Sequence, residues 1–113
     1  MDRRKELREQ YKNRKITGGV YRLLNRENGK YFLKSTDEMK AAHSFFKMCY
    51  DFDNCTLPSV AQDWKTYGRE AFCIEELDLL EKGEDQTTEE YRRDLKTLYE
   101  LWEEKLPREL RYG

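Results

Sequence analysis

The chain has 113 residues, of which 40% are charged and 13% aromatic. This length suits one domain with one core, and the aromatic content is too high for a disordered chain. The sequence has no apolar run long enough to span a membrane and no signal peptide, so we expect a cytoplasmic protein with no membrane association.

Three cysteines and a single histidine leave too few ligands at useful spacing for a zinc site. From composition alone we therefore expect no bound cofactor. Magnesium and manganese prefer oxygen ligands, so whether the chain could bind them depends on the positions of its carboxylates.

Charge is distributed unevenly along the chain. Residues 1–15 carry seven basic and three acidic side chains, a net charge of +4, whereas residues 75–113 carry thirteen acidic and seven basic ones, a net charge of −6. Residues 2–14 also contain good helix formers, with Leu7 and Tyr11 on one face, which predicts a polar N-terminal helix. We favour a solvated helix docked by these two side chains over a basic arm that binds phosphates.

Residues 18–35 contain the clearest local signal, a β-hairpin. Two short apolar runs flank Asn28-Gly29, and both residues tolerate the positive φ of a type I′ turn. With these as the two turn residues, Leu24 faces Leu33 across the ladder. Side chains alternate along a strand, and one face then carries Tyr21, Leu23, Asn25, Phe32 and Lys34.

Two helices are predicted after the hairpin. Ser35 and Glu38 fit a capping box, and apolar residues then recur at helical spacing as far as Cys49. A second helix is expected to begin at Pro58, which suits the first helical position, and to end at Gly68.

The remaining residues predict a strand and a long helix. Residues 71–77 favour a strand with Phe72 and Ile74 on one face. Thr87 and Glu90 form a second capping box, and Pro107 ends the helix that follows. Its apolar stripe is Tyr91, Leu95, Leu98, Trp102 and Leu106. The sequence thus predicts an α+β fold that is preceded by a helix at the N-terminus.

Several short motifs occur together in an order that resembles the GIY-YIG endonuclease superfamily. They are Gly19-Val20-Tyr21, the turn Asn28-Gly29-Lys30, the run Trp64-Lys65-Thr66-Tyr67-Gly68, and the strand residues from Ile74 to Leu80. The resemblance spans residues 18–106. It implies an α/β sandwich, in which a small three-stranded antiparallel sheet is flanked by helices. It divides the chain into an N-terminal basic helix (1–17), a GIY-YIG-like domain (18–107) and a tail (108–113).

The resemblance also implies a mechanism, hydrolysis of a DNA phosphodiester with one divalent metal. The family uses two motif tyrosines, a helix arginine that stabilises phosphate charge and a glutamate that holds the metal. Here the first tyrosine matches Tyr21, but the second falls at Phe32, the arginine at Ala42 and the glutamate at Tyr99. The glycine of the second motif is Lys34. Three of the four catalytic positions therefore hold different chemistry.

Three functional interpretations follow. We favour a nuclease-like domain that has lost phosphodiesterase activity and binds nucleic acid or protein. The second is an active nuclease, dependent on magnesium or manganese, with relocated groups drawn from Tyr21, Lys34, His43 and Glu100. The third is a protein-interaction domain without a nucleic-acid role. A positive concave surface around Tyr21 would favour nucleic acid, and a neutral or acidic one would favour protein.

Each candidate also has an ordinary structural interpretation. Tyr21 fits a strand aromatic in the core, Lys34 a solvated strand end, and His43 a histidine at the rim of a helix. Glu100 fits a solvated helix face.

Overall fold

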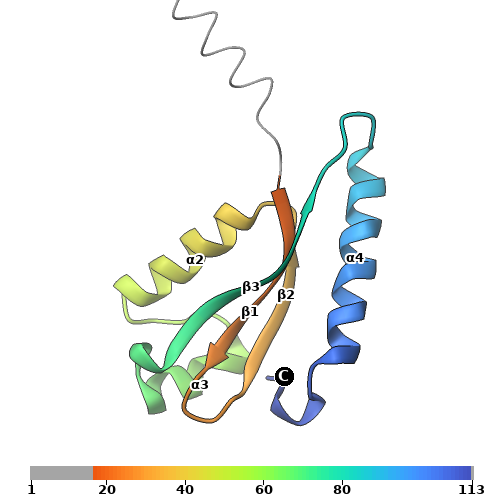
Figure 1. Cartoon of the computed structure of the whole chain (residues 1–113). Coiled ribbons are helices and arrows are strands. Elements are labelled where there is room, and N and C mark those ends of the chain that lie inside the picture. Colours follow the sequence, from red (N-terminus) through yellow and green to blue (C-terminus); the bar gives the residue numbers. More distant parts are fainter. Residues whose placement is uncertain (1–16, 113) are drawn as a thin grey trace, which may run out of the picture.

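The computed structural model describes residues 17–112 of the chain (Figure 1). They contain an antiparallel sheet with strand order β2-β1-β3, formed by β1 (Thr17–Asn25), β2 (Tyr31–Thr36) and β3 (Phe72–Glu81). The helices are α2 (Met39–Asp51), α3 (Pro58–Tyr67) and α4 (Thr88–Lys105), with short helical turns η1 (Arg69–Ala71) and η2 (Arg108–Leu110). The predicted α+β fold with a three-stranded antiparallel sheet is confirmed.

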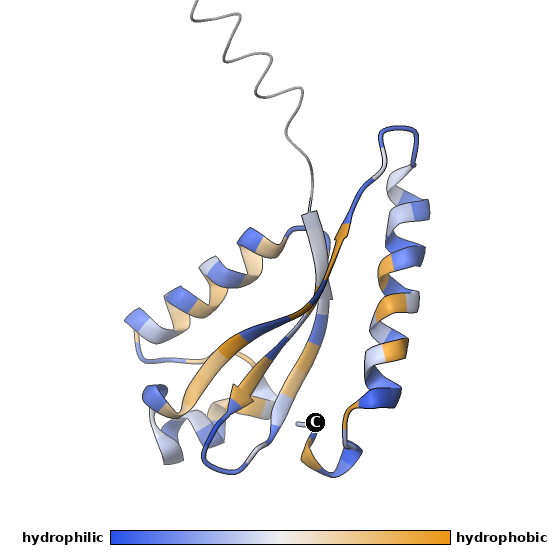
Figure 2. Cartoon of the chain, viewed as in Figure 1, coloured by the Kyte–Doolittle hydropathy of each residue, from blue (hydrophilic) through white to orange (hydrophobic). Residues whose placement is uncertain are grey.

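The sheet separates two packed layers. Helices α2 and α3 lie on one face and α4 on the other (Figure 1). The side chains under α2 and α3 include Tyr21, Leu23, Ala42, Val60, Trp64 and Phe72. Those under α4 include Val20, Tyr31, Leu33, Leu98 and Trp102. Apolar and polar positions alternate along α4 (Figure 2), as expected for a helix with one buried stripe.

The hairpin is present, but its turn differs from the predicted one. Leu24 pairs with Tyr31 rather than Leu33, and the Asn25 amide donates to the Lys30 carbonyl, so the loop comprises the four residues 26–29 instead of two. The register has moved by two residues. Because side chains alternate with a period of two, every side chain keeps its predicted face.

Asn25 explains the longer turn. Its side chain is fully buried and accepts a hydrogen bond from the Glu27 amide while donating to the Tyr112 hydroxyl at 3.1 Å. The Asn28 side chain donates to Asp63 on α3, and the Tyr112 hydroxyl donates to the same carboxylate. The contacts with Tyr112 and Asp63 come from residues distant in sequence. The hydrogen bonds to Glu27 and Tyr112 satisfy the buried side-chain amide of Asn25.

The predicted start of α2 is wrong, whereas those of α3 and α4 are confirmed. Strand β2 continues through Thr36, so Ser35 lies in the sheet, and the N-cap of α2 is Glu38 without a side-chain cap. Pro58 opens α3, and Gly68 ends it with φ of 85°. The Thr87 hydroxyl accepts a hydrogen bond from the Glu90 amide at 3.1 Å, as a capping box predicts.

Strand β3 is longer than predicted. It extends from Phe72 to Glu81, because the early part of β1 offers it further pairing partners, such as Gly19 opposite Leu79. A bulge at Leu77 separates the pairs on either side of it. The alternation on which the prediction was based breaks at this bulge.

The end of the chain packs against the domain. Tyr112 is buried among the side chains under α2 and α3, and its amide donates to the Tyr31 carbonyl at 2.8 Å. The predicted domain boundaries at residues 17 and 107 stay predictions, and the predicted N-terminal helix and basic arm lie outside the described residues. Within residues 17–112, no helix combines the length and apolarity that crossing a bilayer requires.

Candidate functional site

Tyr21 occupies the middle of a row of side chains across the sheet. Strand β1 is central, and its residue Tyr21 pairs with Lys34 on β2 and with Glu76 on β3. The Tyr21 residue is only 4% exposed, and burial raises the pKa of its phenol. A base at neutral pH needs an accessible deprotonated form, and this shift makes the phenolate rarer still.

A hollow of about 250 Å³ lies over Tyr21. The sheet contributes Tyr21, Lys34 and Thr36, and the other lining residues are Ala41, Ala42, Phe45 and Leu57. Ala42, the position that the resemblance assigns to the arginine, therefore shares this hollow with Tyr21. Lys34 is the charged residue of this lining, and the carboxylate of Glu76 lies on the other side of Tyr21, on β3.

His43 lies outside this hollow. Its Nε2 is 2.7 Å from Oε1 of Glu76, and both side chains are exposed. The residues Lys34, Tyr21 and Glu76 thus follow one another across the sheet, with His43 attached to the far end of the row. The Tyr21 hydroxyl makes no hydrogen bond with His43 or with any other side chain of residues 17–112.

Glu100 is separated from the other candidates. It lies on α4, on the opposite side of the sheet from α2, and lines a different cavity together with Glu103, Glu104 and Arg108. The structure therefore brings Tyr21 and Lys34 together, places His43 one side chain away, and leaves Glu100 apart. Phe32 packs with the side chains under α2 and α3.

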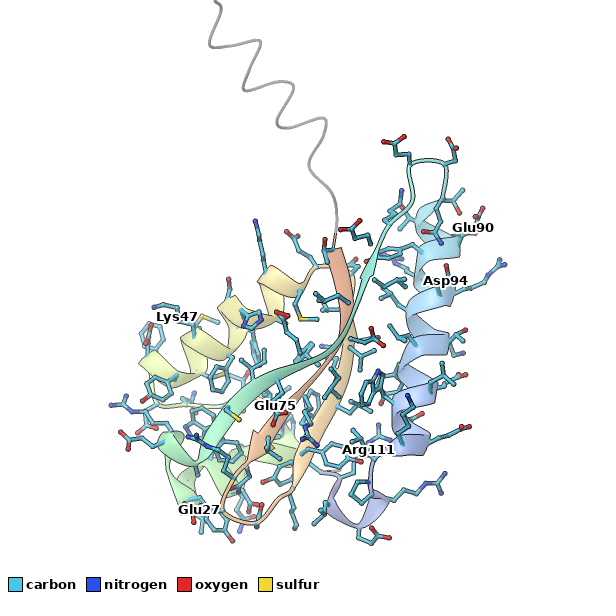
Figure 3. The ribbon with its side chains drawn as sticks, viewed as in Figure 1. Glu27, Lys47, Glu75, Glu90, Asp94 and Arg111 are labelled. Carbon is cyan, nitrogen blue, oxygen red and sulfur yellow. The ribbon has the colours of Figure 1, made fainter. Side chains whose placement is uncertain are left out.

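Tyr99, at the position assigned to the metal-binding glutamate, lines a second groove of about 600 Å³ between the edge strand β2 and α4. Its hydroxyl accepts a hydrogen bond from Arg111, which also forms an ion pair with Glu103. Arg111 lies beside the C-terminal end of α4 (Figure 3). Tyr99 is therefore held by the C-terminal segment.

Positive side chains surround this groove. Lys34 from β2 and Arg92 and Lys96 from α4 line it and are exposed. Asp37 is the acidic member of the lining, and Leu33 and Leu95 supply apolar surface. Lys34 lines both this groove and the hollow over Tyr21. We call the groove between β2 and α4 the β2–α4 groove.

The residues present do not fit the divalent metal that the resemblance implies. Among residues 17–112, no group of three or more histidine, cysteine, aspartate or glutamate side chains could hold a metal ion. Tyr99 offers a phenol where the resemblance implies a carboxylate, and carboxylate oxygens are the ligands that magnesium prefers. Glu76, beside Tyr21, is already paired with His43.

Sequence reasoning missed Glu76, Arg92 and Lys96. The signal for Glu76 was its parity with Phe72 and Ile74, which places all three on one face of β3. Arg92 and Lys96 follow Tyr91 and Leu95 of the apolar stripe by one residue each, so both flank that stripe on the same side. Which strand they would face could not be derived from this spacing.

Comparisons with known proteins support the fold. The structure is similar to that of a mutant form of the catalytic domain of intron endonuclease I-TevI, with a TM-score of 0.60 and 15% sequence identity. The similarity covers 87% of this chain and 93% of that domain, and it shows a GIY-YIG-like fold. No protein-family model matches the sequence, and no curated protein matches it either.

Proposed function

We propose that this chain is a nucleic-acid-binding domain on a GIY-YIG-like nuclease fold, and that it binds phosphates without cleaving them. The observation that carries the proposal is the charge of the β2–α4 groove. Three exposed cations, Lys34, Arg92 and Lys96, line one concave surface with a single acid, Asp37. Lysine and arginine side chains that neutralise phosphates supply most of the affinity for nucleic acid.

Loss of cleavage is supported by the chemistry around Tyr21. A phosphodiester transition state gathers negative charge, which enzymes meet with a metal and preset cations. Ala42 offers no charge, Tyr99 no carboxylate, and the phenol of Tyr21 has a raised pKa because it is buried. Lys34 remains as a cation near Tyr21, but residues 17–112 offer no group of three or more ligating side chains that could hold a metal beside it.

A cleavage assay tests the loss of activity. The purified chain is incubated with plasmid DNA and with labelled single-stranded and duplex oligonucleotides, over a range of magnesium and manganese concentrations. We expect no products beyond those formed with Tyr21→Phe. Metal-dependent cleavage that disappears in Tyr21→Phe would instead favour the active nuclease with relocated groups, of which Lys34 and His43 lie near Tyr21 and Glu100 does not.

A binding assay tests the nucleic-acid role. Fluorescence anisotropy with labelled DNA and RNA at low salt should show binding that weakens in Lys96→Gln. The matched control is Arg93→Gln, which removes a charge from the same helix but outside the groove lining. Equal loss in both variants would indicate nonspecific attraction, and no binding to any nucleic acid would contradict the proposal.

A protein-interaction role is the second candidate, and one feature favours it. Phe52 is 76% exposed and Met48 54%, and the two lie four residues apart at the end of α2. Large exposed apolar side chains at neighbouring positions are typical of protein contacts. If nucleic acid does not bind, Phe52→Ser is the variant to compare with the unchanged chain in a search for protein partners.

A further inference from the structure

We infer that the β2–α4 groove takes a single strand of nucleic acid rather than a duplex. This inference rests on the proposed function and adds the form of the ligand. The groove lies between the edge of β2 and one side of α4, and its volume is about 600 Å³. Proteins usually recognise a duplex by inserting a helix or a β-ribbon into its grooves, whereas they bind single strands inside positively charged grooves of their own.

The cations are arranged along the groove. Arg92 and Lys96 are four residues apart on α4, which places them on the same side of the helix one turn apart. Lys34 also lines the groove, at the edge of β2, although its side chain lies on the Tyr21 face of the sheet. A strand that follows the groove would therefore meet the positive charge of Arg92 and Lys96 along the α4 wall, while Asp37 restricts where its phosphates lie.

Tyr99 supplies an aromatic ring in the same groove. It is half-buried, and Arg111 donates to its hydroxyl while the guanidinium carbon lies 5.7 Å from the ring centroid. The ring is thus held in place from the side of the C-terminal segment. Unpaired bases stack on aromatic side chains, and bases inside a duplex are not available for this contact.

The edge of β2 adds backbone groups. The Tyr31 carbonyl accepts from the Tyr112 amide, which lies off the sheet edge, and backbone groups alternate in direction along a strand. Ser35, four residues on, therefore points its amide and carbonyl the same way, toward the groove that it lines. Ser35 is half-buried and, within residues 17–112, has no side-chain hydrogen bond. Its amide is placed to donate to a phosphate or a base.

The test compares one labelled DNA sequence as a single strand and as a blunt duplex, by anisotropy at several salt concentrations. We expect the single strand to bind at least about tenfold more tightly, since stacking on one aromatic ring is worth roughly that factor. The logarithm of its affinity should fall against the logarithm of salt with a slope of about −1.4, because the two cations of α4 each contribute about −0.7.

Two pairs of variants separate stacking from charge. Tyr99→Leu should weaken single-strand binding about tenfold without changing the salt slope, and Tyr99→Phe, which keeps the ring, should bind nearly as well as the unchanged chain. Lys96→Gln should reduce the slope by about 0.7, whereas Arg93→Gln should not. Circular dichroism of each variant verifies that it is folded.

The outcomes separate this inference from the proposed function. Preferential binding of the single strand that depends on the Tyr99 ring supports both. Equal or tighter binding of the duplex, or an unchanged affinity in Tyr99→Leu, overturns the single-strand inference and leaves the proposed function standing. Absence of binding to either form overturns both.

Discussion

Tyr112 lies one residue from the end of the chain, yet it is buried and connects three parts of the fold. Its ring packs among the side chains under α2 and α3, and its hydroxyl contacts Asn25 in β1 and Asp63 in α3. Burial raises the pKa of Tyr112 to about 12. At the residue scale, this phenol makes the free energy of unfolding depend on pH in the alkaline range.

We predict that stability falls as the pH rises from about 10 to about 12. Below pH 10 the phenol is protonated in both states, whereas above it the unfolded state ionises first and binds fewer protons, so unfolding becomes easier. Urea denaturation at several pH values measures this. Tyr112→Phe should show a smaller loss of stability at alkaline pH. At neutral pH its free energy of unfolding should be lower by about 1–2 kcal/mol, because the side-chain N–H group of Asn25 loses its acceptor. An identical pH dependence in both proteins would contradict the prediction.

Gly18 is a second residue whose size matters. Its amide donates to the Tyr91 hydroxyl at 2.7 Å, and an added Cβ would lie 2.2 Å from the Thr36 carbonyl oxygen and 2.6 Å from that hydroxyl. Gly18→Ala should therefore cost at least about 1–3 kcal/mol, since backbone has to move. The control is Gly83→Ala, whose Cβ would be no closer than 3.5 Å to its neighbours. Equal free energies of unfolding for the two variants would mean that β1 and α4 can move apart at little cost to accommodate the added methyl group.

At the element scale, α4 is attached to the sheet by one apolar stripe. Leu95 is 4% exposed, and Tyr91 is also buried, whereas the charged residues Arg92, Arg93 and Lys96 are exposed. Glu90 and Asp94 also lie on this helix (Figure 3). Because few side chains of this long charged helix are buried, each buried one contributes a large share of the packing between α4 and the sheet.

Leu95→Ala should lower the free energy of unfolding by about 2–5 kcal/mol, because it truncates a buried side chain of α4. Glu100→Ala on the same helix should change it by less than about 0.5 kcal/mol, because that side chain is exposed. Chemical denaturation measures both. Similar small losses would show that α4 does not depend on this stripe.

At the scale of the whole molecule, the sheet joins two packed layers into one unit. The strands contribute side chains to both layers, and each layer contains one tryptophan, Trp64 on α3 and Trp102 on α4. Trp64 stacks on Phe72, and the Trp102 indole donates to Asp78 at 3.3 Å. Both tryptophans thus contact β3 from opposite faces.

We predict one cooperative unfolding transition for both layers. The single-tryptophan proteins Trp64→Phe and Trp102→Phe report on opposite faces by fluorescence, and in each protein the fluorescence midpoint should coincide with the circular dichroism midpoint. Since each substitution changes stability, the comparison is made within each variant. A fluorescence transition that precedes loss of secondary structure in only one variant would show that its layer unfolds separately.

The sequence by itself determined the elements and their faces. The Asn28-Gly29 dipeptide predicted a hairpin, Pro58 and Gly68 bounded α3, and the Thr87 cap began α4, because each of these signals acts through residues a few positions apart. The predicted faces of Tyr21 and Lys34 also held, since a register shift of two preserves side-chain alternation.

Only the tertiary structure decided the register, the length of β3 and the composition of the candidate site. The turn follows from Asn25 meeting Tyr112 from the far end of the chain, and β3 extends because β1 pairs with it. The β2–α4 groove combines Lys34 with Lys96, which are distant in sequence. Such contacts depend on how whole elements pack, and neither periodicity nor capping specifies which element lies opposite.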